Sequence, residues 1–271
     1  LRAARAANRG EKRRLPAMTS FAGGMGALPA RLAAELEARG ALHCANGVGA
    51  IGPEAGGWRV TAERGVYSCR RLVVALPVNQ ALELVRAALP DQPPPLAAVP
   101  EARILSVLLG FGGEARIPFG FGYLAPEREG RFTLGALFSS HMFPGRAPAG
   151  GQLLEALVGG RRHPERLELA DDELIKRVYE DLRQLMDLPE PPRFAAVLRP
   201  SSAIPQLEAG YTDLLAWREA VHARVAGLRL CGFGWTGIGI NDMVKEARRA
   251  AEAICSPAAA TGGPEVKGVY F

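Results

Sequence analysis

Short apolar runs, separated by glycine and proline, alternate with longer helical stretches along the first third of the chain. Residues 28–40, LPARLAAELEARG, carry leucines one helical turn apart, which predicts a helix that ends at Gly40. The apolar runs that follow predict strands at 41–51, 58–62, 65–69 and 70–76, and 78–89 predicts a second helix. This order of elements is typical of the later part of a nucleotide-binding α/β domain.

The proline-rich segment 90–100 predicts a linker into a second block that is rich in β-structure. Its amphipathic helix is expected at 171–188, where Asp171 and Asp172 occupy positions that favour capping and the helix dipole over acid–base chemistry. Residues 201–211 predict a connecting loop. The predicted strands of the block are 103–111, 120–126, 131–140, 152–160 and 193–200. The pattern predicts an α/β plus α+β fold, with an incomplete Rossmann-like domain and a second domain built on a mixed sheet.

Residues 228–254, LRLCGFGWTGIGINDMVKEARRAAEAI, place a G-x-G-x-x-G spacing between a predicted strand and a predicted helix. A true dinucleotide fingerprint opens a βαβ unit and needs an acidic residue about 20 positions later. Only CSPAAATGGPEVKGVYF follows, which is too short and too rich in glycine and proline for that unit. A pyrophosphate-binding role is therefore excluded for this motif.

Two interpretations of these glycines remain open. They either form a tight turn that packs against a sheet, or they let the backbone approach a flat ligand such as a flavin. In the second case Asn241 and Asp242 would cap the following helix, and the unpaired amides of Met243 and Val244 would face the ring edge that becomes negative on reduction.

Composition narrows the class of protein. Hydrophobic residues make up 48% of the 271 residues and charged residues 23%, which is typical of a globular protein with a sizeable core. The net charge of +5 includes a basic cluster in residues 1–14, which has no interleaved aromatic residues; this favours a solvated helix face over a nucleic-acid or membrane-binding arm. The four cysteines and four histidines lack metal-ligand spacing, so no metal is expected and a reducing cytoplasm is predicted.

Several segments together resemble the oxygen-dependent protoporphyrinogen and coproporphyrinogen oxidases, FAD enzymes of haem synthesis within the flavin amine-oxidase superfamily. They are FAGGMGALPARLAAEL, GVGAI, LVVALP, GFGYLAPERE, LGALFSSHMFPGRAPAG, LLEALVGG, AIPQLEAGY and LCGFGWTGIGINDMVKEARRAAEAI. They run in the family's order over most of the chain. The glycine-rich segments are shared with amine oxidases and carotenoid desaturases, whereas residues 120–148 are the specific ones.

The resemblance implies a role for individual residues and for larger regions. FAD contacts are implied for Val48 at the adenine end and for Phe233, Ile238, Gly239, Ile240 and Met243 near the ring, and tetrapyrrole contacts for Phe121, Gly122, Leu124 and Leu157. The implied regions are 1–79 in the FAD-binding domain, 80–210 in the substrate-binding domain, 211–255 returning to the FAD-binding domain, and a flexible tail at 256–271.

The implied activity is hydride transfer from a porphyrinogen to FAD, with oxygen as the final acceptor and no catalytic side chain. The pyrophosphate fingerprint, the ribose-binding acid and an arginine for a substrate propionate are expected upstream of Leu1. We therefore expect this chain to be the C-terminal portion of the enzyme and to hold FAD weakly alone. The resemblance leaves peripheral association with the cytoplasmic membrane and homodimer formation open.

Two alternatives to this function stay open at the level of sequence. One is another flavin enzyme of the superfamily, an amine oxidase or a desaturase, in which Trp235 and Tyr211 would supply an aromatic cage. The other is a fragment without catalytic activity that binds a ligand or partner.

Overall fold

The computed structural model describes residues 18–255, which form two compact units divided after Cys44. The basic cluster of residues 1–14 and the predicted flexible tail 256–271 lie outside the described residues. The first unit contains helix α2 (Ala27–Glu37), as predicted from its leucine spacing. The chain leaves the helix through Gly40, whose φ of +62° is a conformation that glycine adopts readily, and the amide of Ala41 donates to the carbonyl of Leu36.

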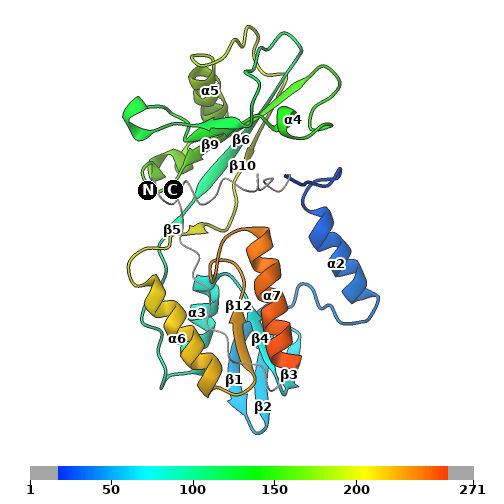
Figure 1. The fold of residues 1–271 in the computed structure, drawn as a ribbon, viewed down its shortest axis with the longest axis vertical. Helices are drawn as coiled ribbons and strands as arrows, with labels where there is room; N and C mark the ends of the chain where they lie inside the picture. Colours follow the sequence, from blue (N-terminus) through cyan, green and yellow to red (C-terminus); the bar gives the residue numbers. More distant parts are fainter. Residues whose placement is uncertain (1–17, 256–271) are drawn as a thin grey trace, which may run out of the picture. The chain divides into compact units, whose positions relative to one another are not determined.

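The second unit contains two separate hydrophobic cores, and the first is built around a pair of parallel strands (Figure 1). Strands β4 (Leu72–Ala75) and β12 (Leu228–Cys231) pair in parallel although they lie far apart in the sequence. An antiparallel sheet of order β1-β2-β3 shares this core through Ile51 and Trp58. We call this first core, with the elements around it, the parallel-pair core. Its other elements are β1 (Val48–Glu54), β2 (Gly57–Ala62), β3 (Gly65–Cys69), α3 (Val78–Ala88), α6 (Tyr211–Arg224) and α7 (Ile240–Cys255).

Sequence patterning did not predict helix α6. Its buried positions are spaced as on one helix face, but that face carries a polar residue in its middle: Leu214, Arg218 and Val221 are all buried. The indole of Trp217 is partly buried beside the core, and its Nε1 donates to the carbonyl of Gln92. The apolar stripe contains an arginine, and apolar side chains also lie beside it. The hydrophobicity of the two helix faces therefore differs little, and a helix is hard to recognise from the sequence.

The second core lies under one face of a five-stranded antiparallel sheet of order β10-β6-β9-β8-β7 (Figure 1). Helix α5 (Asp171–Leu182) covers that face through Leu174, Val178 and Leu182. We call this second core the five-stranded core. Its strands are β6 (Ile104–Phe111), β7 (Gly122–Leu124), β8 (Gly135–Leu137), β9 (Gln152–Gly159) and β10 (Phe194–Leu198), and its short helices are η1 (Glu127–Glu129), α4 (Ser139–Met142) and η2 (Pro164–Glu168).

Three local expectations in this core are wrong. The predicted strand 131–140 is a strand only at β8, because Ser139 and Ser140 already belong to α4. Helix α5 ends at Leu182, before the predicted end at 188. The first turn of α5 does carry Asp171 and Asp172 beside the positive end of the dipole, but its N-cap is Ala170 with no side-chain hydrogen bond, and Asp171 pairs with Arg199 at 2.7 Å.

The chain crosses between the two cores at a very short antiparallel ladder. Strand β5 (Glu101–Ala102) precedes β6, and strand β11 (Ile204–Pro205) lies between β10 and α6. The two strands pair with each other, so both crossings pass side by side. Residues 201–211, predicted as a plain loop, therefore contain a short strand. The domain boundaries expected from sequence stay a prediction.

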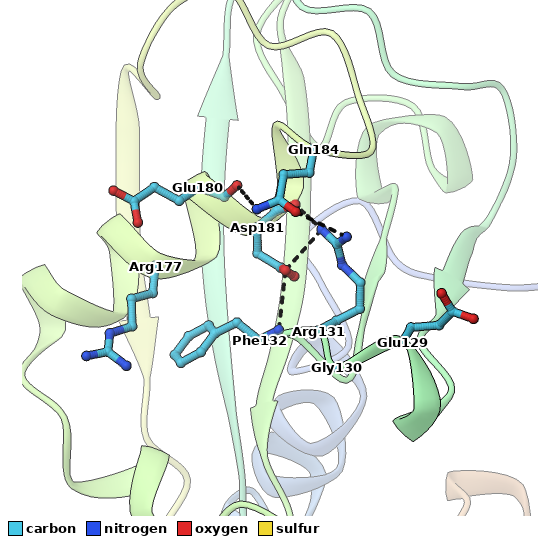
Figure 2. A pocket seen from close by; sticks show the side chains of 8 residues that line it. All are labelled: Glu129, Gly130, Arg131, Phe132, Arg177, Glu180, Asp181 and Gln184. Carbon is cyan, nitrogen blue, oxygen red and sulfur yellow. Dashed lines mark hydrogen bonds and ion pairs between the residues drawn. The ribbon is translucent and has the colours of Figure 1, made fainter.

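A buried carboxylate joins α5 to the segment that precedes β8, at the edge of a hollow of about 380 Å³ (Figure 2). Asp181 accepts hydrogen bonds from the amide and hydroxyl of Thr133 at 3.1 and 2.7 Å, and its other oxygen lies 3.0 Å from the guanidinium of Arg131. Both charged side chains are largely buried. Because water cannot replace these partners, the packing of this segment on α5 depends on Asp181.

We predict that Asp181→Ala destabilises the protein by about 3–5 kcal/mol, because it leaves the largely buried charge of Arg131 without its acidic partner. Urea unfolding at neutral pH measures the effect. The matched control is Glu180→Ala, one position earlier on the same helix, where the side chain is exposed and the expected change is within about 0.5 kcal/mol. Equal stability of the two variants would contradict this assignment.

Candidate functional site

The glycine-rich segment Gly232–Gly239 forms the turn that joins β12 to α7, and its first two glycines pack against the protein itself. Gly232 and Gly234 have φ of +117° and +87°. A Cβ at Gly232 would lie 2.7 Å from the carbonyl oxygen of Leu76, and one at Gly234 would lie 2.6 Å from Pro205. Of the two interpretations left open by the sequence, close packing accounts for these two glycines.

The far end of the same turn is exposed although it is apolar. Ile238 is 48% exposed and Ile240 is 41% exposed, with Gly239 exposed between them. Phe233 and Met243 are half-buried at either side of this segment. The structure thus brings five of the predicted flavin contacts together, on a surface of backbone and aliphatic groups that suits a flat ring.

The sixth predicted flavin contact, Val48, begins strand β1 in the separate antiparallel sheet of the same core and is 46% exposed. It pairs with Ala62 of β2, and the register shifts between Val48 and Ala50. Its role at the adenine end stays a prediction.

Helix α7 starts earlier than expected, because Asn241 and Asp242, which were predicted to cap it, already lie within its first turn. It begins at Ile240, and the amides of Asp242 and Met243 both donate to the carbonyl of Gly239. The expectation of an unpaired Met243 amide is therefore wrong, and Asp242 lies in the first turn instead of at the cap. The first-turn amides of Ile240 and Asn241 have no carbonyl a full turn earlier in the helix, so the positive end of α7 still lies at this turn.

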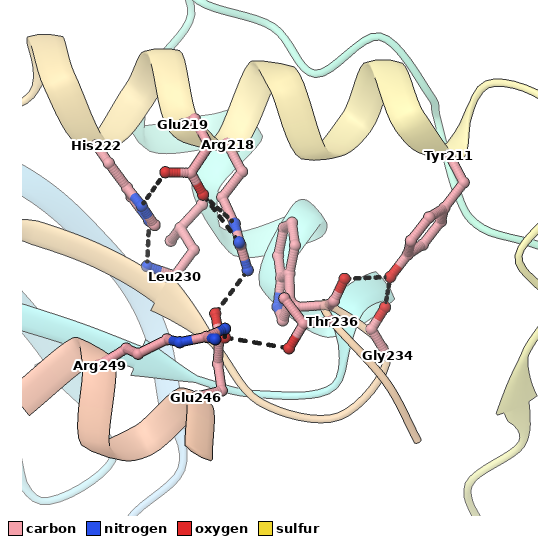
Figure 3. A network of polar contacts seen from close by, with 10 residues as sticks. Tyr211, Arg218, Glu219, His222, Leu230, Gly234, Thr236, Glu246 and Arg249 are labelled. Atoms are coloured by element: carbon pink, nitrogen blue, oxygen red, sulfur yellow. Dashed lines mark hydrogen bonds and ion pairs between the residues drawn. The ribbon is translucent and has the colours of Figure 1, made fainter. Parts of the chain in front are cut away.

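A buried polar network holds the turn and the start of α7 against helix α6 (Figure 3). Arg218 is 3% exposed, and its guanidinium lies 2.8 Å from Glu246 of α7 and 2.8 Å from Glu219. Glu246 also accepts a hydrogen bond from the hydroxyl of Thr236, within the turn, at 3.1 Å. The guanidinium lies 5.6 Å from the centre of the Trp235 ring. One buried cation thereby connects α6, α7 and the turn.

The same network reaches the end of β12 through an imidazole. His222 Nε2 accepts a hydrogen bond from the amide of Leu230 at 2.9 Å, which requires that nitrogen to be unprotonated. Its other nitrogen, Nδ1, lies 3.8 Å from Glu219. The contacts with His222 and then Arg218 outweigh burial and lower the pKa of Glu219 to about 2.

Tyr211 and Trp235 belong to the core and do not form an exposed aromatic cage. Trp235 is fully buried, and the hydroxyl of Tyr211 donates to the carbonyls of Gly234 and Trp235 (Figure 3). Burial raises the pKa of Tyr211 to about 12, so the hydroxyl remains a donor at neutral pH. These two rings therefore fix the turn from inside the protein.

Three of the four predicted tetrapyrrole contacts lie on one face of the five-stranded sheet, opposite α5. Leu124 pairs with Gly135, and Gly135 pairs with Leu157, so all three side-chain positions share this face. Gly122 lies two residues before Leu124 on the same strand. A Cβ at Gly122 would come within 2.2 Å of the carbonyl of Ala136, so glycine is needed for strand pairing there. Phe121, the fourth predicted contact, precedes β7 and is half exposed. Its carbonyl accepts a hydrogen bond from the amide of Phe138.

Sequence reasoning missed three neighbours on this face. Leu137 pairs with both Gly122 and Glu155, and Glu155 pairs with Leu108 on the next strand. All three side chains are half-buried. Strand alternation would have placed Glu155 on the same face as Leu157, two residues away, but the neighbours from other strands required the sheet order. The hollow beside Asp181, by contrast, is lined partly by α5 and by none of the predicted site residues.

Comparison with known proteins identifies the family of the chain. Residues 3–255 match the model of the flavin containing amine oxidoreductase family. The chain is 33% identical over 221 residues to a chloroplastic protoporphyrinogen oxidase of Nicotiana tabacum, covering 74% of this chain and 40% of the relative. It is 31% identical over 254 residues to the chloroplastic protoporphyrinogen oxidase 1 of Arabidopsis thaliana, covering 86% of this chain and 46% of the relative.

Among solved structures, one from Exiguobacterium sp. 255-15 superposes with a TM-score of 0.72 at 22% identity, over 87% of this chain and 51% of that one. Such likeness shows a shared fold and confirms the predicted combination of α/β and α+β parts. The expected mixed sheet is wrong in detail, because all pairings in the five-stranded sheet are antiparallel. The chain spans less than half the length of the two curated relatives. Within residues 18–255, no helix is long and apolar enough to cross a bilayer.

The depressed pKa of Glu219 predicts a pH dependence of stability. A carboxylate whose folded pKa of about 2 lies below its ordinary value of 4.5 stabilises the fold above pH 4.5, and this contribution disappears as the pH falls toward 2. We expect Glu219→Gln to be less stable than the wild type at pH 7, with a difference that shrinks through this window in urea unfolding series. The control, Glu252→Gln, removes an exposed pair with Arg248 and should change stability little at any pH. A Glu219→Gln difference that stays constant from pH 7 to pH 3 would refute the assignment.

Proposed function

Because the chain belongs to the flavin containing amine oxidoreductase family, we propose that it forms part of an FAD-dependent oxidase that converts protoporphyrinogen or coproporphyrinogen into the porphyrin, with oxygen as the acceptor. The observation that carries this proposal is the open apolar face of the five-stranded sheet, which gathers Gly122, Leu124 and Leu157. A tetrapyrrole is a large, mostly apolar disc, and a flat aliphatic face suits it. The curated relatives are named for oxidation of such substrates.

The residues at the glycine turn fit one edge of a flavin. Ile238, Gly239 and Ile240 are exposed and apolar, and the positive end of α7 lies beside them. We propose that these residues, with Phe233 and Met243, hold the ring and that Val48 contacts the adenine end. The flavin would supply the hydride acceptor, and the protein would orient the porphyrinogen and exclude water.

The polar network under the turn would act as a support for this site. Arg218 and Glu246 fix the start of α7 relative to the turn, and Tyr211 fixes the carbonyls of Gly234 and Trp235. A site whose backbone is already fixed loses less entropy on binding a ligand. The proposed reaction requires no nucleophile and no general base from the side chains of the turn or of the sheet face.

An amine oxidase is less well supported. The two aromatic residues that the sequence offered for a cage, Trp235 and Tyr211, are buried, and their polar atoms face the protein interior or the backbone of the turn. We also propose a cytoplasmic location, which rests on the scattered cysteines. Peripheral membrane association and dimerisation stay predictions from the family resemblance.

We expect the protein, expressed from its complete reading frame, to purify with flavin absorbance. It should consume oxygen and form hydrogen peroxide when protoporphyrinogen or coproporphyrinogen is added. An oxygen electrode together with porphyrin fluorescence measures both sides of the reaction. A flavoprotein that oxidises amines and neither porphyrinogen would contradict the proposal.

We predict that Gly239→Val lowers flavin occupancy at least tenfold, because its branched side chain would occupy space proposed for the ring. The fold should tolerate the change, since a Cβ at Gly239 would meet only the carboxyl group of Asp242, whose nearer oxygen would lie 3.2 Å away. Flavin absorbance per protein and the melting temperature measure the two effects separately. The control is Gly52→Val on strand β1, where a Cβ meets nothing within 4 Å. Full flavin occupancy in Gly239→Val would place the ring elsewhere.

A further inference from the structure

The face of the five-stranded sheet opposite α5 contains two continuous rows of side-chain positions. One row runs through Leu198, Ser106, Leu157, Gly135 and Leu124. The parallel row runs through Ala196, Leu108, Glu155, Leu137 and Gly122. Glu155 therefore occupies the middle strand of a surface whose other side chains are aliphatic except for Ser106.

Glu155 is the one ionisable residue among the strand positions of this face in the described chain. Its Oε1 accepts a hydrogen bond from the hydroxyl of Ser106 at 2.8 Å. Within residues 18–255 the carboxylate makes no ion pair and no second hydrogen bond. Other acids in the same core, such as Asp181, Asp171 and Glu114, are paired with arginine, whereas the strand neighbours of Glu155 are Leu108 and Leu137.

A half-buried carboxylate among leucines is costly unless donors satisfy its oxygens, and covering the face with an apolar ligand would remove the remaining water. Leucine or threonine at this position would fill the same face without that cost. The placement of Glu155 therefore suits a ligand that is apolar at its surface and offers hydrogen-bond donors at its centre. A single neutral hydroxyl, that of Ser106, leaves most of the acceptor capacity of the carboxylate unused.

A porphyrinogen has this distribution of polarity. All of its pyrrole nitrogens carry hydrogen, and its saturated bridging carbons let the pyrroles tilt, so that the N–H groups can converge on an acceptor above one face of the macrocycle. The porphyrin product is planar, and only half of its nitrogens carry hydrogen, which lies within the ring plane. One carboxylate can therefore distinguish the reduced from the oxidised macrocycle.

On the basis of the proposed function, we propose that Glu155 is a specificity-determining residue that accepts hydrogen bonds from the converging pyrrole N–H groups of the reduced tetrapyrrole. The leucines around it cover the macrocycle, and Ser106 orients the carboxylate. The charged acceptor makes these hydrogen bonds stronger than neutral ones. Binding at this face then favours the porphyrinogen over the porphyrin.

The test compares Glu155→Leu, Glu155→Gln and Ser106→Ala with the wild type in the flavin-loaded protein from the complete reading frame. The KM for coproporphyrinogen or protoporphyrinogen comes from oxygen uptake, and the Kd for the matching porphyrin comes from quenching of porphyrin fluorescence. We expect Glu155→Leu to raise KM about ten- to hundredfold, the range for a lost hydrogen bond to a charged group, and to leave the porphyrin Kd unchanged or lower. The KM of Glu155→Gln should lie between those of the wild type and Glu155→Leu. Ser106→Ala should keep the preference for the reduced macrocycle.

The comparison of reduced and oxidised macrocycles separates recognition from structural damage. A distorted sheet would weaken the binding of porphyrinogen and of porphyrin together. Melting temperatures within a few degrees of the wild type would confirm that the sheet is intact. If the wild type turns over porphyrinogen and Glu155→Leu has the same KM, or loses both ligands equally, the role of Glu155 is refuted while the proposed function stands. If the wild type oxidises neither porphyrinogen, both proposals fail.

Discussion

A guanidinium buried inside the parallel-pair core constrains every element around it. Arg218 is almost fully enclosed, and a buried cation without an acidic partner costs several kcal/mol. Its two acids come from different places, Glu219 from the same helix and Glu246 from α7. The start of α7 and the glycine turn therefore cannot shift independently of α6, because any such shift would separate the charges. The exposed part of the turn owes its fixed position to an interaction that lies beneath it.

In the five-stranded sheet, strand alternation separates the side chains of the core from those of the opposite face. On β6, Leu105, Val107 and Leu109 are buried toward α5, while Ser106 and Leu108 face the opposite side. The first set supplies the core and the second leaves the opposite face to the proposed ligand, so the same strand serves stability on one face and the proposed binding site on the other. A shift of one residue in register would exchange the two sets and place Glu155 in the core. The hydrophobic effect acting on the α5 face thus fixes which side chains the opposite face presents.

Much of this arrangement could be predicted from the sequence, and the failures have physical causes. Hydrophobic spacing located α3, α5 and the strands β2, β3, β6 and β9, because each has a clear apolar pattern of its own. Helix α6 was missed because Arg218 interrupts its buried stripe, and β11 because two residues carry no periodicity. The glycine turn was located correctly, but the glycines that pack against the protein could not be told from the exposed Gly239 without the positions of Leu76 and Pro205. Glu155 was missed because its significance depends on Leu108 and Leu137, which belong to other strands.

The ladder between β5 and β11 has an evolutionary consequence. It is only two residues long on each strand, and it brings the entry and the exit of the five-stranded core next to each other. A segment whose two ends meet in this way behaves as an insertion in the parent fold, since it can lengthen, shorten or change the residues on its sheet face without separating β4 from β12. The glycine turn and the sheet face can therefore diverge at different rates. Such a junction permits proteins that share the glycine turn while their sheet faces differ.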